Sequence, residues 1–319
     1  MIEYSNRIFG KDNRTYLMGV AILWIVFFHI YLWCNMSGIA TSWWIELFDK
    51  GALGVDVFLM LSAYGLQASM EKNKIGRFYL NRAKRLFPTY ILFLVTLFLT
   101  FERHCPIDRM IEQSICQITG LSLFKYPEFF SCGFCFDWFT PAIIFVYICF
   151  PLISRVVGRV VEKGIWYEAG MLLMLVVAGV WIRENKHFPF GLLAVRFPII
   201  YIGMVSYLHV KKAEVRILLG LCVLAACMGL LSSHEEMRLS LLVPPLLVTF
   251  SLVRFKLPLY RLVSIVGRHS YEVYLAHIFA VAFFIPTKQI INIPLLLLIT
   301  ALSTMVLATL YSYVHKYFV

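Results

Sequence analysis

The chain has 319 residues, of which 61% are hydrophobic and only 15% charged, and its basic residues exceed its acidic residues by 11. Soluble globular proteins have about 25% charged residues, so this composition excludes an ordinary soluble domain and indicates a protein that lies mostly in lipid. A surplus of Lys and Arg would suit a nucleic-acid partner, or the cytoplasmic loops of a membrane protein. The distribution of these residues decides between the two.

Apolar stretches near the roughly 20 residues that a helix needs to cross the hydrocarbon core follow one another along the chain. In order they lie at 16–34, 52–69, 86–101, 137–154, 167–183, 192–209, 214–231, 238–254, 269–286 and 293–315. A weaker candidate at 110–124 carries Glu112, Gln113 and Gln117, and we expect it to be amphipathic or partly buried. The sequence therefore predicts an all-α, polytopic membrane protein with about ten transmembrane helices in one integral-membrane domain, residues 1–319.

The basic residues are distributed unequally between the two sides of these spans. If the amino terminus is cytoplasmic, the inner connections hold 20 Lys and Arg residues and the outer connections hold eight, while Arg196 lies within a span. This bias follows the positive-inside rule, so we expect both termini in the cytoplasm and no nucleic-acid partner. The first span is long and lacks a small-residue cleavage site, so we expect it to stay as a helix and not to be removed as a signal peptide.

The long outer connection, residues 102–136, holds four of the eight cysteines, which are Cys105, Cys116, Cys132 and Cys135. On an oxidising face these four could pair in any of three connectivities, or they could remain free thiols. The CGFC at 132–135 has the spacing of a redox motif, but no thioredoxin-like strand and helix surround it. We therefore expect structural disulfides or free thiols and no redox site.

The first two spans each carry an ionisable residue. His29 lies in ILWIVFFHIYLW, and from a cytoplasmic start near residue 16 it is about 20 Å along the helix, in the outer half of the membrane. Asp56 opens the second span at a similar depth, and Ser62 lies deeper. A buried His can simply pack and hydrogen-bond, and an Asp can cap a helix. Alternatively, Asp56 could orient His29 as a general base, because a neutral imidazole takes up a proton near neutral pH.

A basic cluster precedes the third span. Arg82, Lys84 and Arg85 stand at its cytoplasmic start, and Arg82 and Arg85 share a helix face because they are three residues apart. Such clusters are common where a chain obeys the positive-inside rule. Guanidinium groups also suit phosphate recognition, so we expect a phosphate-bearing cytoplasmic ligand here.

Buried polar residues recur later in the chain. The segment GRHSYEVYLAHIF, residues 267–279, places Ser270, Tyr271, Glu272 and His277 in or beside the ninth span. Arg196 lies in the sixth span. A charged side chain within a span is costly when unpaired, so Arg196 needs a partner, either Glu272 or a ligand.

In order, these segments resemble the membrane-bound acyltransferase-3 family, whose members acylate hydroxyls of cell-surface polysaccharides and other acceptors. That family typically has a first helix ending in His, a GVD-F-F-x-x-SG-like second helix and an R-x-x-R-x-x-P start to the third. A W-F…Y…P segment and a late G-x-x-S-Y-x-x-Y-L-x-H follow. The matching residues are His29; Gly54, Val55, Asp56, Phe58 and Ser62; Arg82, Arg85 and Pro88; Trp138, Phe139, Tyr147 and Pro151; and Gly267, Ser270, Tyr271, Tyr274, Leu275 and His277. The resemblance covers nearly the whole chain.

One position departs from the family pattern. The family usually has Arg or Lys eleven residues before the histidine, and Met18 occupies that place here. Arg14 is the nearest cation, one turn earlier and about 60° away around the helix. Either Arg14 substitutes, or phosphate binding falls to Arg82, Lys84 and Arg85, or activity is impaired. Ala63, where the family usually has Gly, is a milder change.

The resemblance implies a mechanism and its partners. The donor would be acetyl-CoA or another acyl-CoA from the cytoplasm, bound by Arg82, Arg85, Lys84 and Arg14, and no metal is expected. His29, oriented by Asp56, would deprotonate a hydroxyl of a cell-surface or lipid-linked glycan, which attacks the thioester directly or through an acyl-enzyme. The protein would lie among the lipids of the bacterial inner membrane. The other polar residues expected around the substrate are Ser62, Trp138, Tyr147, Arg196, Ser270, Tyr271, Glu272 and His277.

Three other readings share the ten-span pattern. A transporter or flippase of envelope precursors would usually show inverted repeats or paired Gly/Pro-broken helices, and the sequence shows neither. A scaffold for an envelope assembly would not need a buried His–Asp pair. A degenerate family member that binds acyl-CoA without turnover fits the Met18 departure.

Overall fold

The computed structural model describes residues 9–36, 38, 48–101, 106–125, 137–185, 189–253, 259–284 and 293–318. These residues form helices and connecting turns, with no strand among them. The helices are α2 (Lys11–Met36), η1 (Asp49–Leu53), α4 (Gly54–Lys72), α5 (Ile75–Phe101), α6 (Ile107–Thr119), η2 (Leu121–Leu123), α7 (Phe139–Lys163), α8 (Ile165–Asn185), α9 (Phe190–Ala194), α10 (Phe197–Lys212), α11 (Val215–Leu231), α12 (Glu235–Val253), α13 (Tyr260–Arg268), α14 (Ser270–Phe284) and α15 (Ile293–Phe318).

The predicted all-helical, multi-span architecture is confirmed in its coarse form. Each predicted span overlaps a helix, and the sixth is divided between α9 and α10. By length and composition, seven described segments can cross a membrane: Lys11–Leu32, Asp49–Lys72, Ile75–Thr100, Phe139–Lys163, Ile165–Asn185, Phe190–Lys212 and Leu298–Tyr317. A shorter apolar helix covers Val215–Leu231. The count of ten spans and the cytoplasmic placement of both termini therefore stay predictions.

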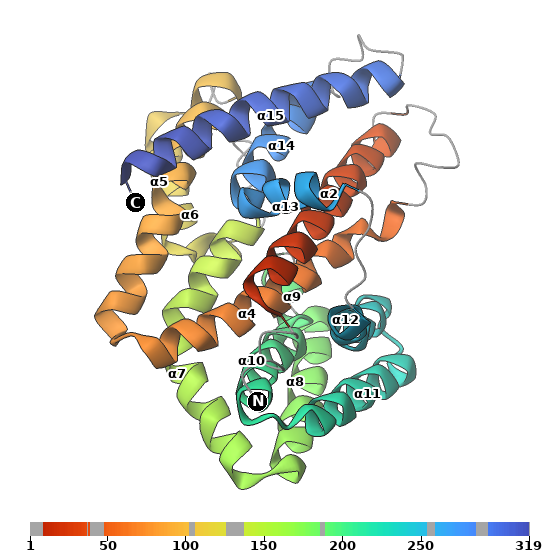
Figure 1. Cartoon of the computed structure of the whole chain (residues 1–319). Helices are drawn as coiled ribbons and strands as arrows, with labels where there is room; N and C mark the ends of the chain where they lie inside the picture. Colours follow the sequence, from red (N-terminus) through yellow and green to blue (C-terminus); the bar gives the residue numbers. More distant parts are fainter. Residues whose placement is uncertain are drawn as a thin grey trace.

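The most buried long helices of the bundle are α4 and α10. α2 packs against α4, α13 and α14, while α4 also packs against α10 (Figure 1). α15 crosses the bundle beside α14 and α5, and α11 and α12 pair on the opposite side. This arrangement brings the start of the chain, around residue 20, next to its last third, around residue 270.

Two glycines fix how α2 and α13 cross. A Cβ atom added to Gly19 would meet the backbone oxygen of Val263, and one added to Gly267 would meet the backbone oxygen of Thr15. The two backbones are therefore in direct contact, and only glycine fits at either position. His29 follows Gly19 by ten residues on α2, about 15 Å at the helical rise, whereas Gly267 lies near the end of α13 and His277 on the next helix, α14. The crossing thus fixes α2 against α13, directly before α14 begins.

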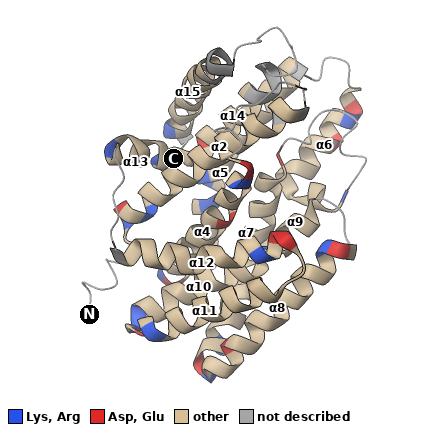
Figure 2. Ribbon diagram, turned by 90° about the vertical axis from the view of Figure 1, so that its right-hand side faces the viewer, with Lys and Arg blue, Asp and Glu red and all other residues tan. Residues whose placement is uncertain are grey.

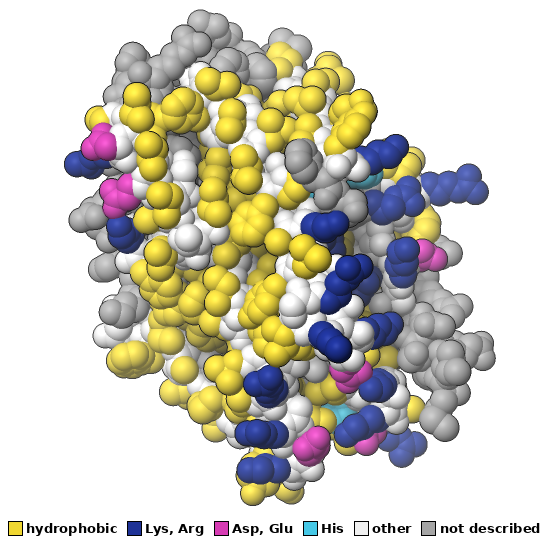
Figure 3. Space-filling model, turned by 90° about the vertical axis from the view of Figure 1, so that its left-hand side faces the viewer, with side chains coloured by type: hydrophobic (Ala, Val, Ile, Leu, Met, Phe, Trp, Pro, Cys, Tyr) yellow, Lys and Arg dark blue, Asp and Glu magenta, His cyan; other side chains and the backbone are white. Residues whose placement is uncertain are grey.

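The surface divides into an apolar band and charged edges. Figure 3 shows hydrophobic side chains covering most of one face, with Lys and Arg gathered along one edge. Figure 2, drawn from the opposite side, shows that most of the ribbon is tan and that the charged residues are few and scattered. Large apolar side chains on this surface, such as Leu99, Leu152 and Trp166, are exposed by 62%, 66% and 86%. Apolar surface of this extent is typical of contact with lipid.

The weaker span candidate at 110–124 is an amphipathic helix, as predicted. α6 exposes Ile107, Ile111 and Ile115 on one side and buries Gln113 and Gln117 on the other. The Tyr90 hydroxyl of α5 donates a 2.7 Å hydrogen bond to Gln117 Oε1, which ties the buried side of α6 to the bundle.

One of the four cysteines of the outer connection is described. Cys116 is a buried free thiol on α6. The other three, Cys105, Cys132 and Cys135, lie outside the described residues. The expectation that disulfides form in this connection stays a prediction.

Candidate functional site

Two histidines from distant parts of the sequence meet inside the bundle. His29 Nδ1 on α2 lies 3.2 Å from His277 Nε2 on α14, and the two ring centroids are 5.0 Å apart. His277 is fully buried and His29 is half-buried. The sequence predicted a polar role for each residue but did not predict that they form a pair.

Backbone carbonyls assign the proton positions of this pair. The His277 Nδ1–H donates to the Val273 carbonyl oxygen at 3.2 Å, which leaves His277 Nε2 as an acceptor in the neutral ring. The His29 Nδ1–H then points to both the Ile25 oxygen, at 3.0 Å, and His277 Nε2. Because one ring nitrogen of a neutral imidazole carries the proton, His29 Nε2 keeps a free lone pair. That atom is available to accept a proton.

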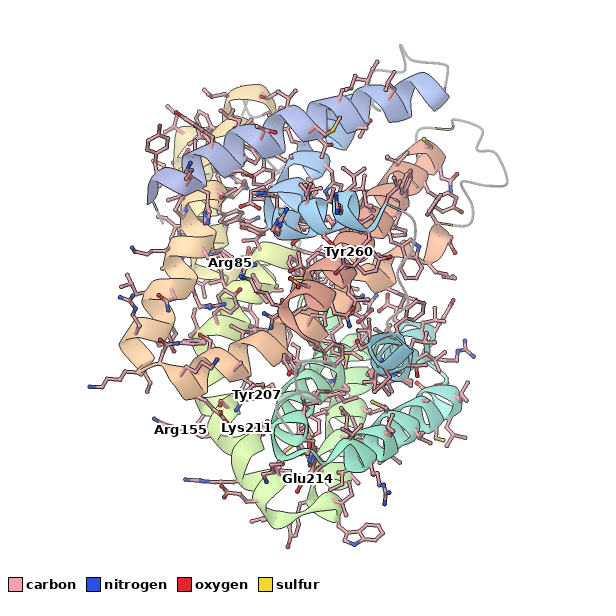
Figure 4. All side chains as sticks on the ribbon, viewed as in Figure 1. Arg85, Arg155, Tyr207, Lys211, Glu214 and Tyr260 are labelled. Atoms are coloured by element: carbon pink, nitrogen blue, oxygen red, sulfur yellow. The ribbon has the colours of Figure 1, made fainter. Side chains whose placement is uncertain are left out.

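A cavity of about 330 Å³ is lined by a group of cations and by Ile25 and Tyr274. Ile25 and Tyr274 precede His29 and His277 by four and three residues on their helices, and the two histidines themselves do not line the cavity. Figure 4 shows Arg85 between the ribbons of α5 and α2. The basic residues that line the cavity are Lys11, Arg14, Arg82, Arg85 and Arg268, and its predicted polar residues are Ser62, Tyr147, Ser270 and Tyr271.

Arg14 and Met18 both line this cavity. The Arg14 guanidinium lies over Gly65 of α4, where a Cβ atom would come within 3.0 Å of Nη1. Because Gly65 has no side chain, the Arg14 side chain can extend over it and bring its guanidinium near Arg82 and Arg85. A cation therefore enters the cavity from α2 even though Met18 stands at the usual position.

Lys84 and Glu272 lie in a second hollow that adjoins the first. This hollow has a volume of about 480 Å³ and is formed by residues of α5, α13, α14 and α15. Of the four residues predicted to bind the cofactor, Arg14, Arg82 and Arg85 share the cavity, and Lys84 faces its neighbour.

The predicted contact between Asp56 and His29 is corrected by the structure. Asp56 is fully buried, and its Oδ1 accepts a 2.7 Å hydrogen bond from Ser240 Oγ of α12. Arg196 Nε lies 3.2 Å from the same oxygen. His277, and not Asp56, is the side chain that contacts the His29 ring nitrogen. An aspartate at matching depth on a neighbouring helix was not enough to predict a contact, because it pointed to another part of the bundle.

The partner of Arg196 is therefore Asp56, and not Glu272 or a ligand as expected. Arg196 is 6% exposed at the start of α10, and its Nη1 donates a 2.7 Å hydrogen bond to the Leu192 carbonyl oxygen. Its guanidinium carbon lies 5.5 Å from the ring centroid of Trp138. A buried ion pair with a cation–π contact holds α4, α7, α10 and α12 together at this point.

Sequence reasoning missed a buried carboxylate beside the site. Asp137 is 1% exposed, and its Oδ1 accepts hydrogen bonds from the Thr140 backbone N–H and the Tyr274 hydroxyl, both at 2.9 Å. The Tyr274 ring in turn lies edge-on to His277, with centroids 5.5 Å apart. The sequence offered one signal, an Asp directly before Trp138 at the start of a predicted span.

Comparison with known proteins identifies the family of the chain. A family model described as an acyltransferase domain matches residues 15–314, nearly the whole chain. The chain belongs to the acyltransferase-3 family. A protein of Acidianus two-tailed virus named "Putative acetyltransferase ORF330" is 24% identical over 182 residues, which is 56% of this chain and 50% of the viral protein. No solved structure matches.

Membership in the acyltransferase-3 family confirms the resemblance drawn from the motifs and indicates acyl transfer by a membrane protein. The matched range spans both histidines, the cations Arg82 and Arg85, and Asp137. The family does not by itself assign a donor, an acceptor or a base to this chain.

Proposed function

We propose that this protein transfers an acyl group, acetyl in the first instance, from cytoplasmic acyl-CoA to a hydroxyl of a cell-surface or lipid-linked glycan. One observation carries the proposal. One cavity is lined by Lys11, Arg14, Arg82, Arg85 and Arg268, and also by Ile25 and Tyr274, which lie within a helical turn of His29 and His277. Cations that can bind phosphate and a nearby reactive group are the two features that an acyl-CoA needs from its site.

The dimensions of the cavity suit a long donor. Arg14 and His29 are 15 residues apart on α2, or about 22 Å at the helical rise. The CoA phosphates would bind the guanidinium groups, which suit phosphate oxygens because they donate from a planar fork. The pantetheine arm would lie between apolar side chains such as Phe58 and Phe139, with Ser62 and Tyr147 available to its amides. The thioester would then reach the level of the histidine pair.

The hydrogen bonds of the pair suggest how the proton moves. His29 Nε2 takes the proton of the acceptor hydroxyl as the oxygen attacks the thioester carbonyl carbon. The C–S bond breaks as the new C–O ester bond forms, and the CoA thiolate leaves with the proton that His29 Nε2 releases. His277 Nε2 accepts from His29 Nδ1–H throughout and stabilises the transient imidazolium, the part that a carboxylate has in a catalytic dyad. His277 is thus a positioning residue, and His29 the base.

The acceptor would approach from the side of the membrane opposite to the cations. This direction follows from the predicted orientation, in which the basic cavity mouth faces the cytoplasm and His29 lies in the outer half of the membrane. A glycan hydroxyl and a cytoplasmic thioester would then meet within the bundle without either substrate crossing the membrane completely.

Radiolabelled acetyl-CoA tests the proposal. The full chain in lipid vesicles, with envelope glycan from its source cells, should transfer label to the glycan and release CoA. His29→Ala is expected to lower the rate by about 10²–10⁴-fold, the usual contribution of a positioned general base. His234→Ala, a histidine of the turn before α12, is the matched control and should leave the rate unchanged. Thermal unfolding in detergent shows whether His29→Ala remains folded.

Three results would contradict the proposed mechanism or the proposed function. Transfer at the wild-type rate in folded His29→Ala would remove His29 from the chemistry. Movement of a lipid-linked saccharide across the vesicle membrane without any acyl-CoA would instead indicate a flippase. Acetyl-CoA binding without turnover in the wild type would identify a degenerate member of the family.

A further inference from the structure

The second hollow is joined to the cavity by shared residues. Arg82, Arg85, Arg268 and Tyr271 line both spaces, so a ligand that enters one can extend into the other. The lining of the hollow also includes Arg77 and Lys84 of α5, which do not line the cavity. The proposed donor occupies the inner cavity, and the outer hollow has no assigned ligand.

One helix supplies two separate sets of cations to these spaces. At about 100° per residue, Arg77 and Lys84 lie within about 20° of each other around α5, whereas Arg82 lies about 140° from Arg77. Arg82 is also held over the Phe78 ring, with its guanidinium carbon 5.8 Å from the ring centroid. Arg82 therefore turns toward the cavity, while Arg77 and Lys84 are exposed and line the outer hollow alone. Arg85 lies between the two sets.

The charge of the outer hollow exceeds what a pyrophosphate needs. Its lining includes five cations and one carboxylate, Glu272, which leaves a net charge of four positive units (5 − 1). The pyrophosphate of CoA carries two negative charges, and a phosphate monoester adds about 1.5 to 2 more at pH 7. A CoA molecule therefore carries close to four negative charges. This total matches the net positive charge of the hollow only if the phosphate monoester lies in the hollow as well.

We propose that the outer hollow binds the adenosine 3′-phosphate of the donor, with Arg77 and Lys84 as the residues that hold this group. Arg82 and Arg85 then hold the pyrophosphate at the junction of the two spaces. The inference rests on the proposed function, because it places the second half of the same acyl-CoA. It makes Arg77 and Lys84 specificity residues that distinguish CoA from donors without a 3′-phosphate.

The kinetic experiment compares two donors, acetyl-CoA and acetyl-dephospho-CoA, with the full chain in neutral-lipid vesicles. The wild type should favour acetyl-CoA in kcat/KM by roughly 10–100-fold, the range for one or two hydrogen bonds to a charged group. In the double variant Arg77→Ala/Lys84→Ala this ratio should fall close to one, chiefly through a higher KM for acetyl-CoA. The matched control is Arg155→Ala/Arg159→Ala, an exposed basic pair of α7 outside both hollows, which should keep the wild-type ratio. Equal use of both donors by the wild type, or an unchanged ratio in the Arg77/Lys84 variant, would overturn the inference and leave the proposed function standing.

A binding experiment tests the 3′-phosphate site independently of acyl transfer. Adenosine 3′,5′-bisphosphate should bind the wild type at least about 10-fold more tightly than adenosine 5′-monophosphate, and the Arg77→Ala/Lys84→Ala variant should lose this difference. If that pattern holds while neither donor is turned over, the site stands and the proposed transfer fails. Equal binding of the two nucleotides by the wild type would overturn the site.

An anionic lipid headgroup is the other source of a phosphate at this place. Repeating the donor comparison in phosphatidylglycerol vesicles distinguishes it. A donor preference that survives in these vesicles supports the nucleotide. If the Arg77/Lys84 variant differs from the wild type only in the anionic vesicles, the hollow binds lipid and the inference is overturned.

Discussion

Replacing Asp56 with alanine is expected to destabilise the bundle before it affects chemistry. The Asp56 carboxylate is fully buried between Ser240 of α12 and Arg196 of α10. The side chain of Arg196 is 8% exposed, so its guanidinium cannot reach bulk water when its partner is removed. Asp56→Ala would leave a buried cation with the Leu192 carbonyl and the Trp138 ring as its remaining contacts.

The size of the effect follows from the asymmetry of buried ion pairs. Removing one partner of such a pair typically costs about 3–5 kcal/mol, because the other charge stays buried without compensation. Replacing both partners with apolar residues of similar volume is often neutral or stabilising. The double variant Asp56→Leu/Arg196→Met should therefore recover most of the stability that Asp56→Ala loses.

Thermal unfolding in detergent, followed by tryptophan fluorescence, measures this difference, and acetyl transfer is measured on the same preparations. Asp56→Ala should unfold several degrees below the wild type, and the double variant should unfold near it and regain transfer. If the double variant is as stable as the wild type but inactive, Asp56 takes part in the reaction and its assignment to the ion pair alone is refuted. A wild-type melting temperature for Asp56→Ala would refute the energetic argument itself.

Three other predictions test how the helices hold the site. Gly267→Val places a branched side chain against the backbone of α2 and should abolish both folding and activity. The control is Gly170→Val, which has open space around the added side chain and should leave the melting temperature unchanged. The ring of His209, at the end of α10, contacts two carboxylates, Glu168 at 2.7 Å and Glu214 at 2.8 Å, and Glu168→Gln removes the charge of the first. The melting temperature should fall by an amount equivalent to about 1–3 kcal/mol, and the donor preference should not change. An altered donor preference would contradict a purely structural role for Glu168. Gly65→Val should displace the Arg14 guanidinium and raise the KM for acetyl-CoA while kcat changes less; an unaffected KM would mean that Arg14 does not bind the donor.

The sequence predicted helices and polar residues well, because both depend on local information. An apolar run near the length of a bilayer defines a span by itself, and a His or Arg within it is conspicuous without knowledge of its neighbours. Pairing depends on the rotation and tilt of each helix, which two helices determine together. The sequence predicts similar depths for Asp56 and His29, yet Asp56 contacts Arg196 and His29 contacts His277. A similar predicted depth leaves open the direction in which each side chain points.

The glycines restrict how the helices can rotate and slide against each other, which the polar residues do not. Gly19 and Gly267 let two backbones touch, and a contact between backbones permits much less rotation and sliding than a contact between flexible side chains. The crossing therefore fixes α2 against α13, and α14, which carries His277, begins two residues after the end of α13. The same logic applies at Gly65, where the room left on α4 decides that a cation one turn away from the usual position can still enter the cavity. In this fold, the place of a charged group in the site depends as much on the small residue that faces it as on its own position in the sequence.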